Sequence, residues 1–341
     1  MNMRTEFHLE QETGSREEQQ DYIGWQDFPP HHKLFVLADG MGGHTGGREA
    51  SRTVGDAVIE YLAEHLSSNS PDPLREALDY ANRALGDRIA ANPGLKGMGT
   101  TLIAVLLDER DGGYQYISVG DSPLYLYNTS GLRRINANHA FAEDLKKMVA
   151  AGEISREEAQ RHPARHAVTS AVMGIDISLI DRRDGSLNNG DTLLLASDGI
   201  QTLDDEAGGE IETLLHNAGA APLAETGRVL LDAVLSKAQP RQDNTSLILV
   251  RIGGLPEAPA TKVLADSRPT QVNLNPVPTA APATAQPSPP PAKHRLFPVL
   301  ALGILIGAAM AAAAFWWWQQ QKRQQLQQYL PHITLPKPAH K

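Results

Sequence analysis

The sequence predicts a globular domain that mixes helices with strands, joined by a proline-rich linker to one membrane-spanning helix. Three observations support this organisation. Residues 1–254 alternate short apolar runs with amphipathic stretches, residues 255–295 are rich in proline, and residues 296–318 carry no charge. A chain of 341 residues is long enough for one large or two ordinary domains.

The spacing of apolar residues predicts the helices and strands of residues 1–254. Residues 47–66 and 72–91 carry apolar side chains at helical spacing. Ser155 and Glu158 form the pattern of a capping box that opens another short helix. This uneven order of elements is compatible with a doubly wound sheet and with an α+β sandwich. Further helices are expected at 140–150 and 223–237, and strands at 34–38, 100–107, 114–119, 123–127, 192–196 and 245–252.

The linker and the apolar segment follow the globular part. A stretch rich in Pro, Ala and Thr cannot bury enough apolar surface to fold, so residues 255–295 are expected to be extended. About 20 apolar residues span a bilayer as a helix, which residues 296–318 satisfy. The alternative, a buried helix of a soluble domain, lacks a core to join beyond such a linker. The short polar tail, 319–341, predicts nothing specific.

Composition restricts the possible partners and compartments. The 40 acidic and 31 basic residues give a net charge of −9, which argues against nucleic acid as a partner. The absence of cysteine excludes disulfides and thiolate metal sites. The N-terminal residues lack the apolar region of a signal peptide. We therefore expect the globular domain to stay in the cytoplasm, anchored to the membrane by residues 296–318.

Two Asp-Gly pairs at the ends of apolar runs are the strongest functional signal. Asp39-Gly40 ends the first run and Asp198-Gly199 follows the run at 192–196. Each run delivers a carboxylate at its tip, and the glycine lets the backbone turn and expose a carbonyl. A single Asp-Gly pair is normally a plain turn, which is what we expect of Asp111-Gly112 and Asp184-Gly185.

Three further carboxylates share this position at the edge of a strand. Asp121 lies between two strand-like runs, Asp243 precedes the last run, and Asp21 precedes a short apolar run. Clustered carboxylates repel one another unless cations neutralise them, and hard divalent cations prefer oxygen ligands. The five aspartates therefore predict a binuclear Mg²⁺ or Mn²⁺ site. A Ca²⁺-binding adhesion or sensor domain is the weaker alternative, because calcium loops gather their ligands within a dozen residues.

The order of these motifs resembles that of the metal-dependent serine/threonine protein phosphatases of the 2C (PPM) type, in particular their bacterial branch. The resemblance covers about residues 4–252 and excludes the linker and the apolar segment. It implies an α+β fold: a four-layer αββα sandwich of two antiparallel sheets flanked by helices, with the metals in a cleft at one end. The motifs are Arg16…Asp21, Asp39-Gly40-Met41-Gly42-Gly43-His44, Gly99-Thr100-Thr101, Gly120-Asp121-Ser122, Ser197-Asp198-Gly199 and Asp243-Asn244.

The resemblance also implies a role for each carboxylate. Asp39 would bridge two metals, and the Gly40 carbonyl would bind the second. Asp198 and Asp243 would complete the ligands of the first. Asp21 would act mostly through metal-bound water, and Asp121 with Asp198 would hold a third, weaker metal.

The implied reaction is the hydrolysis of phosphomonoesters on proteins. Two metals lower the pKa of a bridging water, and the resulting hydroxide attacks phosphorus in line. Arg16 matches an arginine that grips the substrate phosphate with a bidentate fork. His44 is a candidate for proton transfer, or otherwise a structural loop residue. Such an enzyme would act on phosphorylated Ser/Thr proteins and oppose a bacterial Ser/Thr kinase at the inner membrane.

Several positions depart from the family pattern. Gln20 stands where many members have a water-holding carboxylate, with Gln19 beside it, so we expect weaker binding of the second metal. Met41 occupies the place of a histidine in some members. Pro123 replaces an arginine, and Asn138 replaces an aspartate near the flap beside the cleft. These changes motivate an alternative, a catalytically weak phosphatase-like scaffold or phospho-reader.

Overall fold

A computed structural model describes residues 4–68, 70–203 and 209–253. All of them belong to one compact unit, Met1–Lys262. No helix in these ranges is long and apolar enough to cross a membrane. The linker expected at 255–295, the membrane helix at 296–318 and the tail at 319–341 lie outside the described residues.

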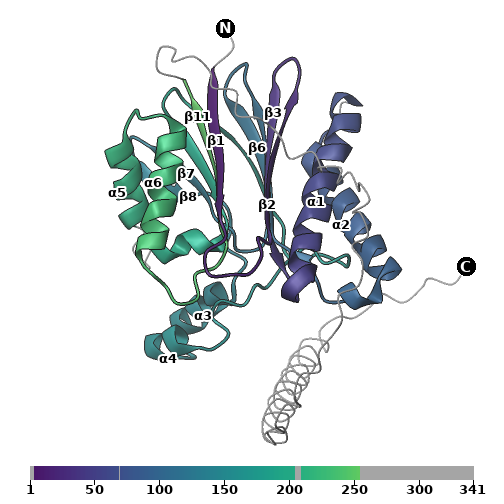
Figure 1. Cartoon of the computed structure of the whole chain (residues 1–341), viewed down its shortest axis with the longest axis vertical. Helices are drawn as coiled ribbons and strands as arrows, with labels where there is room; N and C mark the ends of the chain where they lie inside the picture. The colour runs from purple at the N-terminus through teal and green to yellow at the C-terminus, as the bar shows by residue number, and fades with distance from the viewer. Residues whose placement is uncertain (1–3, 69, 204–208, 254–341) are drawn as a thin grey trace, which may run out of the picture. The chain divides into compact units, whose positions relative to one another are not determined.

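Two antiparallel sheets form the centre of the fold (Figure 1). The first has the strand order β1-β11-β10-β7-β8 and the second has the order β2-β3-β5-β6-β9, with β4 pairing to β3. The strands of the first are β1 (Thr5–Glu12), β11 (Thr245–Ile252), β10 (Thr192–Ala196), β7 (Leu124–Asn128) and β8 (Gly131–Arg134). Those of the second are β2 (Asp21–Phe28), β3 (His32–Met41), β4 (Gly99–Thr100), β5 (Leu102–Asp108), β6 (Gly113–Val119) and β9 (Asp181–Ser186).

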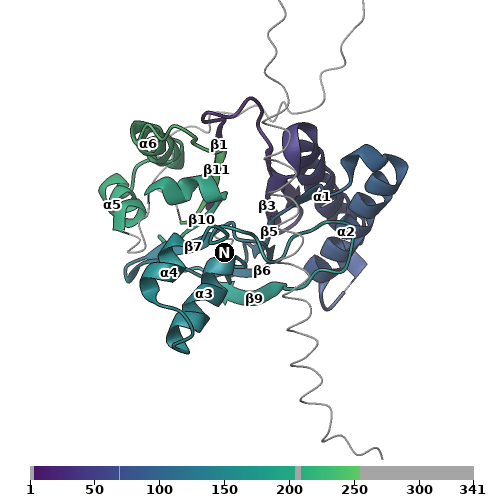
Figure 2. The same cartoon turned by 90° about the horizontal axis from the view of Figure 1, so that it is seen from below.

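Helices cover the outer face of each sheet, which gives four layers (Figure 2). Helices α1 and α2 cover the second sheet, α5 and α6 cover the first, and α3 and α4 lie at one end of the sandwich (Figure 1). The expected αββα sandwich is therefore confirmed, and the doubly wound alternative is wrong. The helices are α1 (Gly43–His65), α2 (Pro73–Ala91), α3 (Phe141–Ala150), α4 (Arg156–Arg161), α5 (Gly209–Ala218) and α6 (Leu223–Ser236), with 3₁₀ turns at Leu66–Ser68, Pro93–Leu95 and Asp198–Leu203.

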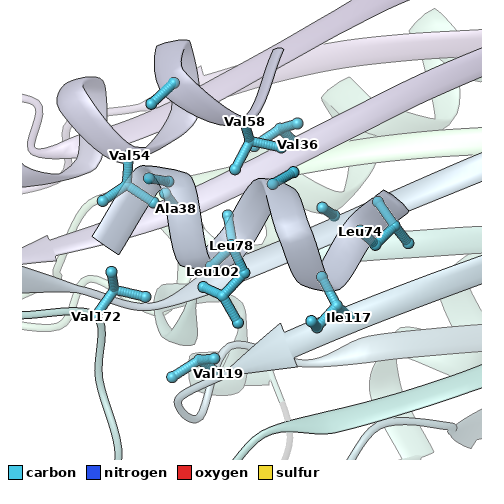
Figure 3. Close-up of a cluster of buried hydrophobic side chains, with 14 of the residues drawn as sticks. Val36, Ala38, Val54, Val58, Leu74, Leu78, Leu102, Ile117, Val119 and Val172 are labelled. Carbon is cyan, nitrogen blue, oxygen red and sulfur yellow. The ribbon is translucent and has the colours of Figure 1, made fainter. Parts of the chain in front are cut away.

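Strand β3 shows why the central runs are continuously apolar. Side chains alternate along a strand, and both faces of β3 are covered. Val36 and Ala38 belong to the cluster packed under α1 and α2 (Figure 3). Phe35 and Leu37 belong to the cluster between the two sheets. A third cluster packs α5 and α6 on the first sheet through Leu194 and other residues. The apolar residues of β3 that precede Asp39 are therefore packed into the core on both faces.

The structure corrects one expected turn and refines one strand. Asp184-Gly185 lies inside β9, not in a turn, with Gly185 opposite Tyr114. A Cβ at Gly185 would lie 2.4 Å from the Tyr114 ring, so a larger residue at this strand position would require the Tyr114 side chain to shift. Asp111-Gly112 is the expected turn between β5 and β6. The strand expected at 100–107 is interrupted at Thr101, whose N–H donates to the carbonyl of Asp39 at 2.9 Å.

Candidate active site

Four of the five predicted carboxylates line one pocket of about 540 Å³. Asp39 lies near the end of β3 and Asp121 follows β6, whereas Asp198 follows β10 and Asp243 precedes β11. The pocket therefore lies where strand ends of both sheets meet. It is also lined by Ser15, Arg16, Glu17, Glu18, Gln20, Gly40, Met41, Gly42, Thr101, Val168 and Asn244.

Asp21 lies behind this pocket and is not among its lining residues. It pairs directly with Asp39 across β2 and β3 and is only 9% exposed. Its carboxylate accepts a hydrogen bond of 2.6 Å from Ser246 Oγ in β11 of the other sheet. Gln11 Nε2 donates to the same hydroxyl oxygen at 2.9 Å. Asp21 therefore links the two sheets beneath Asp39.

Burial raises the pKa of four of these carboxylates, and repulsion between carboxylates adds to the rise at Asp39 and Asp198. Burial, followed by repulsion from Asp21 and Asp198, raises the pKa of Asp39 well above its ordinary value. Burial, followed by repulsion from Asp121 and Asp243, raises the pKa of Asp198 to about 7. Burial also raises the pKa of Asp21 to about 6 and raises that of Asp121. A site of this kind disfavours its own negative charge unless cations balance it.

The donors of the pocket fit hard divalent cations. Four carboxylates and the backbone at Gly40 offer oxygen ligands, which Mg²⁺ and Mn²⁺ prefer. In the described part of the chain, no three His, Asp or Glu side chains are grouped closely enough to hold an ion as they stand. The fit therefore rests on the chemistry of the donors, their shared pocket and their mutual repulsion.

Close backbone packing explains the glycine after Asp39. A Cβ at Gly40 would lie 2.1 Å from the carbonyl oxygen of Gly47 and 2.5 Å from that of Gln20. Both distances are far inside van der Waals contact, so only glycine fits here. Thr101 fixes the preceding residue, because its Oγ1 accepts from the Asp39 N–H at 3.0 Å. Packing against Gly47 and Gln20 and the hydrogen bond to Thr101 therefore fix the end of β3 at Asp39 and Gly40.

Arg16 lies at the rim of the pocket, as its predicted contact with phosphate requires. Its Nη2 lies 2.5 Å from Asp243 Oδ2, and its side chain is 58% exposed. Hydrogen bonding to Asp243 raises the pKa of the Arg16 guanidinium. The arginine is therefore charged and, in this structure, paired with a predicted metal ligand.

Asn244 attaches the segment that carries Arg16 to the strand that follows Asp243. Its Nδ2 donates to the carbonyls of Thr13 at 2.9 Å and Glu18 at 3.1 Å. Its Oδ1 accepts from the Gln20 N–H at 2.8 Å. Asn244 was identified from sequence only as part of a motif. Its structural role depends on contacts with residues more than 200 positions away, which sequence spacing does not reveal.

The remaining expected positions are placed in different ways. His44 lies in the first turn of α1, but its side chain is outside the described part, so its proton-transfer role stays a prediction. Gln20 and Met41 line the pocket. Pro123 accepts a backbone hydrogen bond from Ala196 at 3.0 Å. Asn138 is not among the lining residues, and its amide donates to Glu143 Oε1 at 3.3 Å.

Two acidic pocket residues were missed by the sequence analysis. Glu17 and Glu18 line the pocket directly after Arg16. They do not follow an apolar strand, which was the signal used to select carboxylates. Their proximity to Arg16 in the sequence was the available clue.

Comparisons with known proteins agree with this geometry. The family profile described as protein phosphatase 2C matches residues 13–238. The Ser/Thr protein phosphatase PstP of Mycobacterium tuberculosis is 35% identical over 226 residues, which are 64% of this chain and 40% of PstP. The chain thus spans less than half of that relative. A putative 2C-type phosphatase of Streptococcus pyogenes is 32% identical over 69% of this chain and 92% of its own length.

Solved structures of bacterial phosphatases share the fold. Stp1 of Staphylococcus aureus gives a TM-score of 0.63 at 31% identity, covering 74% of this chain and 97% of Stp1. The catalytic domain of PstP in complex with two manganese ions gives a TM-score of 0.57 at 27% identity, covering 74% of this chain and 99% of that domain. The chain therefore belongs to the protein phosphatase 2C family and is homologous to bacterial Ser/Thr protein phosphatases.

Proposed function

We propose that this protein is a Mn²⁺- or Mg²⁺-dependent serine/threonine phosphoprotein phosphatase. The proposal rests mainly on one observation: Arg16 and four aspartates at strand ends of both sheets line the same pocket. The homology to bacterial Ser/Thr phosphatases supports phosphoproteins as the substrates. The pocket combines oxygen donors for cations with a guanidinium for phosphate, a donor set that suits metal-assisted hydrolysis of phosphate esters.

The proposed cation ligands are the pocket residues that match the family's motifs. Asp39 and the Gly40 carbonyl, with Asp198 and Asp243, are the proposed ligands of two ions. Asp121 and Asp198 are proposed for a third, weaker ion. When bound, Mn²⁺ or Mg²⁺ supplies a Lewis acid that lowers the pKa of water and neutralises charge on phosphate oxygens.

The chain's own residues would bind and orient the substrate. Arg16 is exposed at the rim and presents a planar fork that matches two phosphate oxygens. To do so it must exchange its contact with Asp243 for the phosphate. Asp21 would stay behind the pocket and act through Asp39 and through water, since it is not among the lining residues and its carboxylate accepts from Ser246 Oγ.

The linker and the apolar segment suggest where the enzyme acts. We propose that residues 296–318 anchor the chain in the inner membrane with the catalytic domain, residues 1–254, in the cytoplasm. The linker at 255–295 would then hold the domain near membrane-bound phosphoproteins and a cognate Ser/Thr kinase at raised effective concentration. Fractionation of cells that express the full chain or fragment 1–254 tests this: only the full chain should sediment with membranes, and equal distribution would contradict the anchor.

Hydrolysis of a small aryl phosphate and of phosphoserine and phosphothreonine peptides tests the activity. We expect turnover with Mn²⁺ or Mg²⁺, no turnover with excess chelator, and no turnover by Asp198→Asn with Mn²⁺. Binding of the phosphopeptides without hydrolysis by the folded wild type would instead support the phosphatase-like scaffold.

A further inference from the structure

Arg134, at the end of β8, reaches across to the turn that carries Asp121. Its Nη2 donates to the carbonyls of Asp121 at 2.9 Å and Ser122 at 3.3 Å. The same nitrogen lies 3.5 Å from the carbonyl of Ala137. One guanidinium therefore gathers backbone oxygens from two segments beside the pocket.

Asn136 completes this arrangement from the same side. Arg134 Nε donates to Asn136 Oδ1 at 3.0 Å. The Asn136 amide in turn donates to the Ser122 carbonyl at 2.9 Å, and its Oδ1 accepts from the Leu124 N–H at 2.8 Å. Asn136 is buried, at 6% exposure, and Arg134 is half-buried. Hydrogen bonds from Arg134 and Asn136 therefore hold the backbone of the turn before and after Ser122.

The opposite side of the turn is confined by Thr101, which lies between β4 and β5. Gly120 has a φ of +104°, and a Cβ there would lie 2.6 Å from Thr101 Cγ2. Thr101 Oγ1 also lies 2.8 Å from Ser122 Oγ. With its carbonyls held by Arg134 and its other face against Thr101, the turn presents the Asp121 side chain to the pocket.

We propose that Arg134 is a positioning residue: it holds the turn so that the Asp121 carboxylate faces the pocket, and so sets the affinity for the cation that Asp121 binds. The inference rests on the proposed function. The guanidinium reaches the Asp121 and Ser122 carbonyls through one nitrogen and Asn136 through another, in a fixed fork. A lysine ammonium keeps the charge but lacks that fork.

Calorimetric titration of the purified full-length chain with Mn²⁺ tests the proposal, alongside the Mn²⁺ dependence of turnover. Arg134→Lys should weaken the Asp121-dependent binding phase about tenfold and raise the Mn²⁺ concentration needed for half-maximal turnover. Arg133→Lys is the matched control, because Arg133 is exposed on the same strand and lies outside the pocket. It should behave as the wild type does.

A double-variant cycle separates positioning from general structural support. In an Asp121→Asn background, Arg134→Lys should cause no further change in Mn²⁺ binding, because the carboxylate that it positions is gone. Additive losses in that background, or wild-type binding by Arg134→Lys, would overturn the inference. If urea unfolding shows that Arg134→Lys does not fold, Arg134→Gln, which keeps an amide donor, takes its place in the same cycle.

The test distinguishes this inference from the proposed function. Mn²⁺ binding by a wild type without turnover would contradict the phosphatase proposal, while the binding comparison would still decide the role of Arg134. Turnover by the wild type with unchanged Mn²⁺ binding in Arg134→Lys would contradict only the role of Arg134.

Discussion

Asp21 and Asp39 lie directly opposite one another across the β2–β3 pair, yet they face different surroundings. Asp39 lines the pocket, whereas the carboxylate of Asp21 accepts a hydrogen bond from Ser246 in the other sheet. Like charges directly opposite on a sheet are destabilising. The pair is therefore tolerated because one carboxylate is held by protein donors and the other is available to a cation. Asp39 is therefore a candidate cation ligand, and Asp21 is a buried residue that supports it.

Removing the charge of a pocket carboxylate should abolish turnover without unfolding the domain. Asp39→Asn and Asp198→Asn keep the size of each side chain but lose a charged cation ligand. We expect phosphatase activity to fall at least about 100-fold, the scale of losing an essential electrostatic group. Asp176→Asn, at an exposed aspartate outside the pocket, is the control. A folded Asp198→Asn enzyme with normal activity would overturn the site assignment.

Asn244→Ala should weaken both stability and substrate binding. The buried amide makes three hydrogen bonds to the segment that carries Arg16, and their loss leaves backbone groups without partners. We expect a loss of about 1–3 kcal/mol in the free energy of unfolding and a raised KM, because Arg16 is no longer held at the rim. Urea unfolding and steady-state kinetics measure the two effects.

Asn128→Ala is the control for Asn244→Ala, because Asn128, the last residue of β7, accepts a local hydrogen bond from the Ser130 N–H and is not among the pocket residues. It should change stability little and leave KM unaltered. A normal KM for Asn244→Ala would show that Arg16 is positioned by other contacts.

Gly40→Ala should prevent the strand end from forming its observed structure. The new methyl group would collide with the carbonyls of Gly47 and Gln20, both of them backbone atoms that cannot rotate away. We expect destabilisation of more than about 2 kcal/mol together with loss of activity. Gly209→Ala is the matched control, since a Cβ there meets nothing within 4 Å. Equal thermal midpoints for the two variants would contradict the predicted collision.

The sequence predicted the central elements well because burial dominates them. The runs that became β3, β10 and β11 are apolar on both faces, so their pattern is insensitive to the details of packing. The capping box of α4 was also correct, since Ser155 and Glu158 interact locally. Strand β9, with the sequence DRRDGS, gave no such signal because it is an edge strand with mostly exposed side chains.

The candidate metal ligands could be predicted from the sequence, but the residues that hold them in place could not. Asp39 and Asp198 follow apolar runs, which is a local signal. The contacts of Asn244 with Thr13 and Glu18, and of Ser246 with Asp21, join residues far apart in the sequence. Only the pairing of β11 with β1 and the position of the segment after β1 bring them together. Contacts of this kind leave no periodic pattern in a single sequence, so they could not be predicted from it.

Removal of metal should make the stability of the domain depend on pH in a defined direction. In the folded protein burial raises the pKa of Asp198 to about 7, with repulsion from Asp121 and Asp243 adding to the effect, and burial raises that of Asp21 to about 6. The unfolded chain should have ordinary aspartate values of about 3.9. The folded state therefore binds protons more tightly, and its stability falls as pH rises from about 4 to about 7.

Urea unfolding in excess chelator, repeated across this pH window, measures the effect. Asp198→Asn should flatten the slope because the amide does not titrate, whereas Asp176→Asn should retain it. Mn²⁺ added at about pH 7 should restore stability, because a cation that binds the folded state preferentially shifts the equilibrium toward it. A chelated wild type whose stability stays level or rises across the window would contradict the raised pKa values of these carboxylates. The Asp108 carboxylate, with its pKa lowered to about 2 by Arg110, adds a slope of opposite sign that ends by about pH 5.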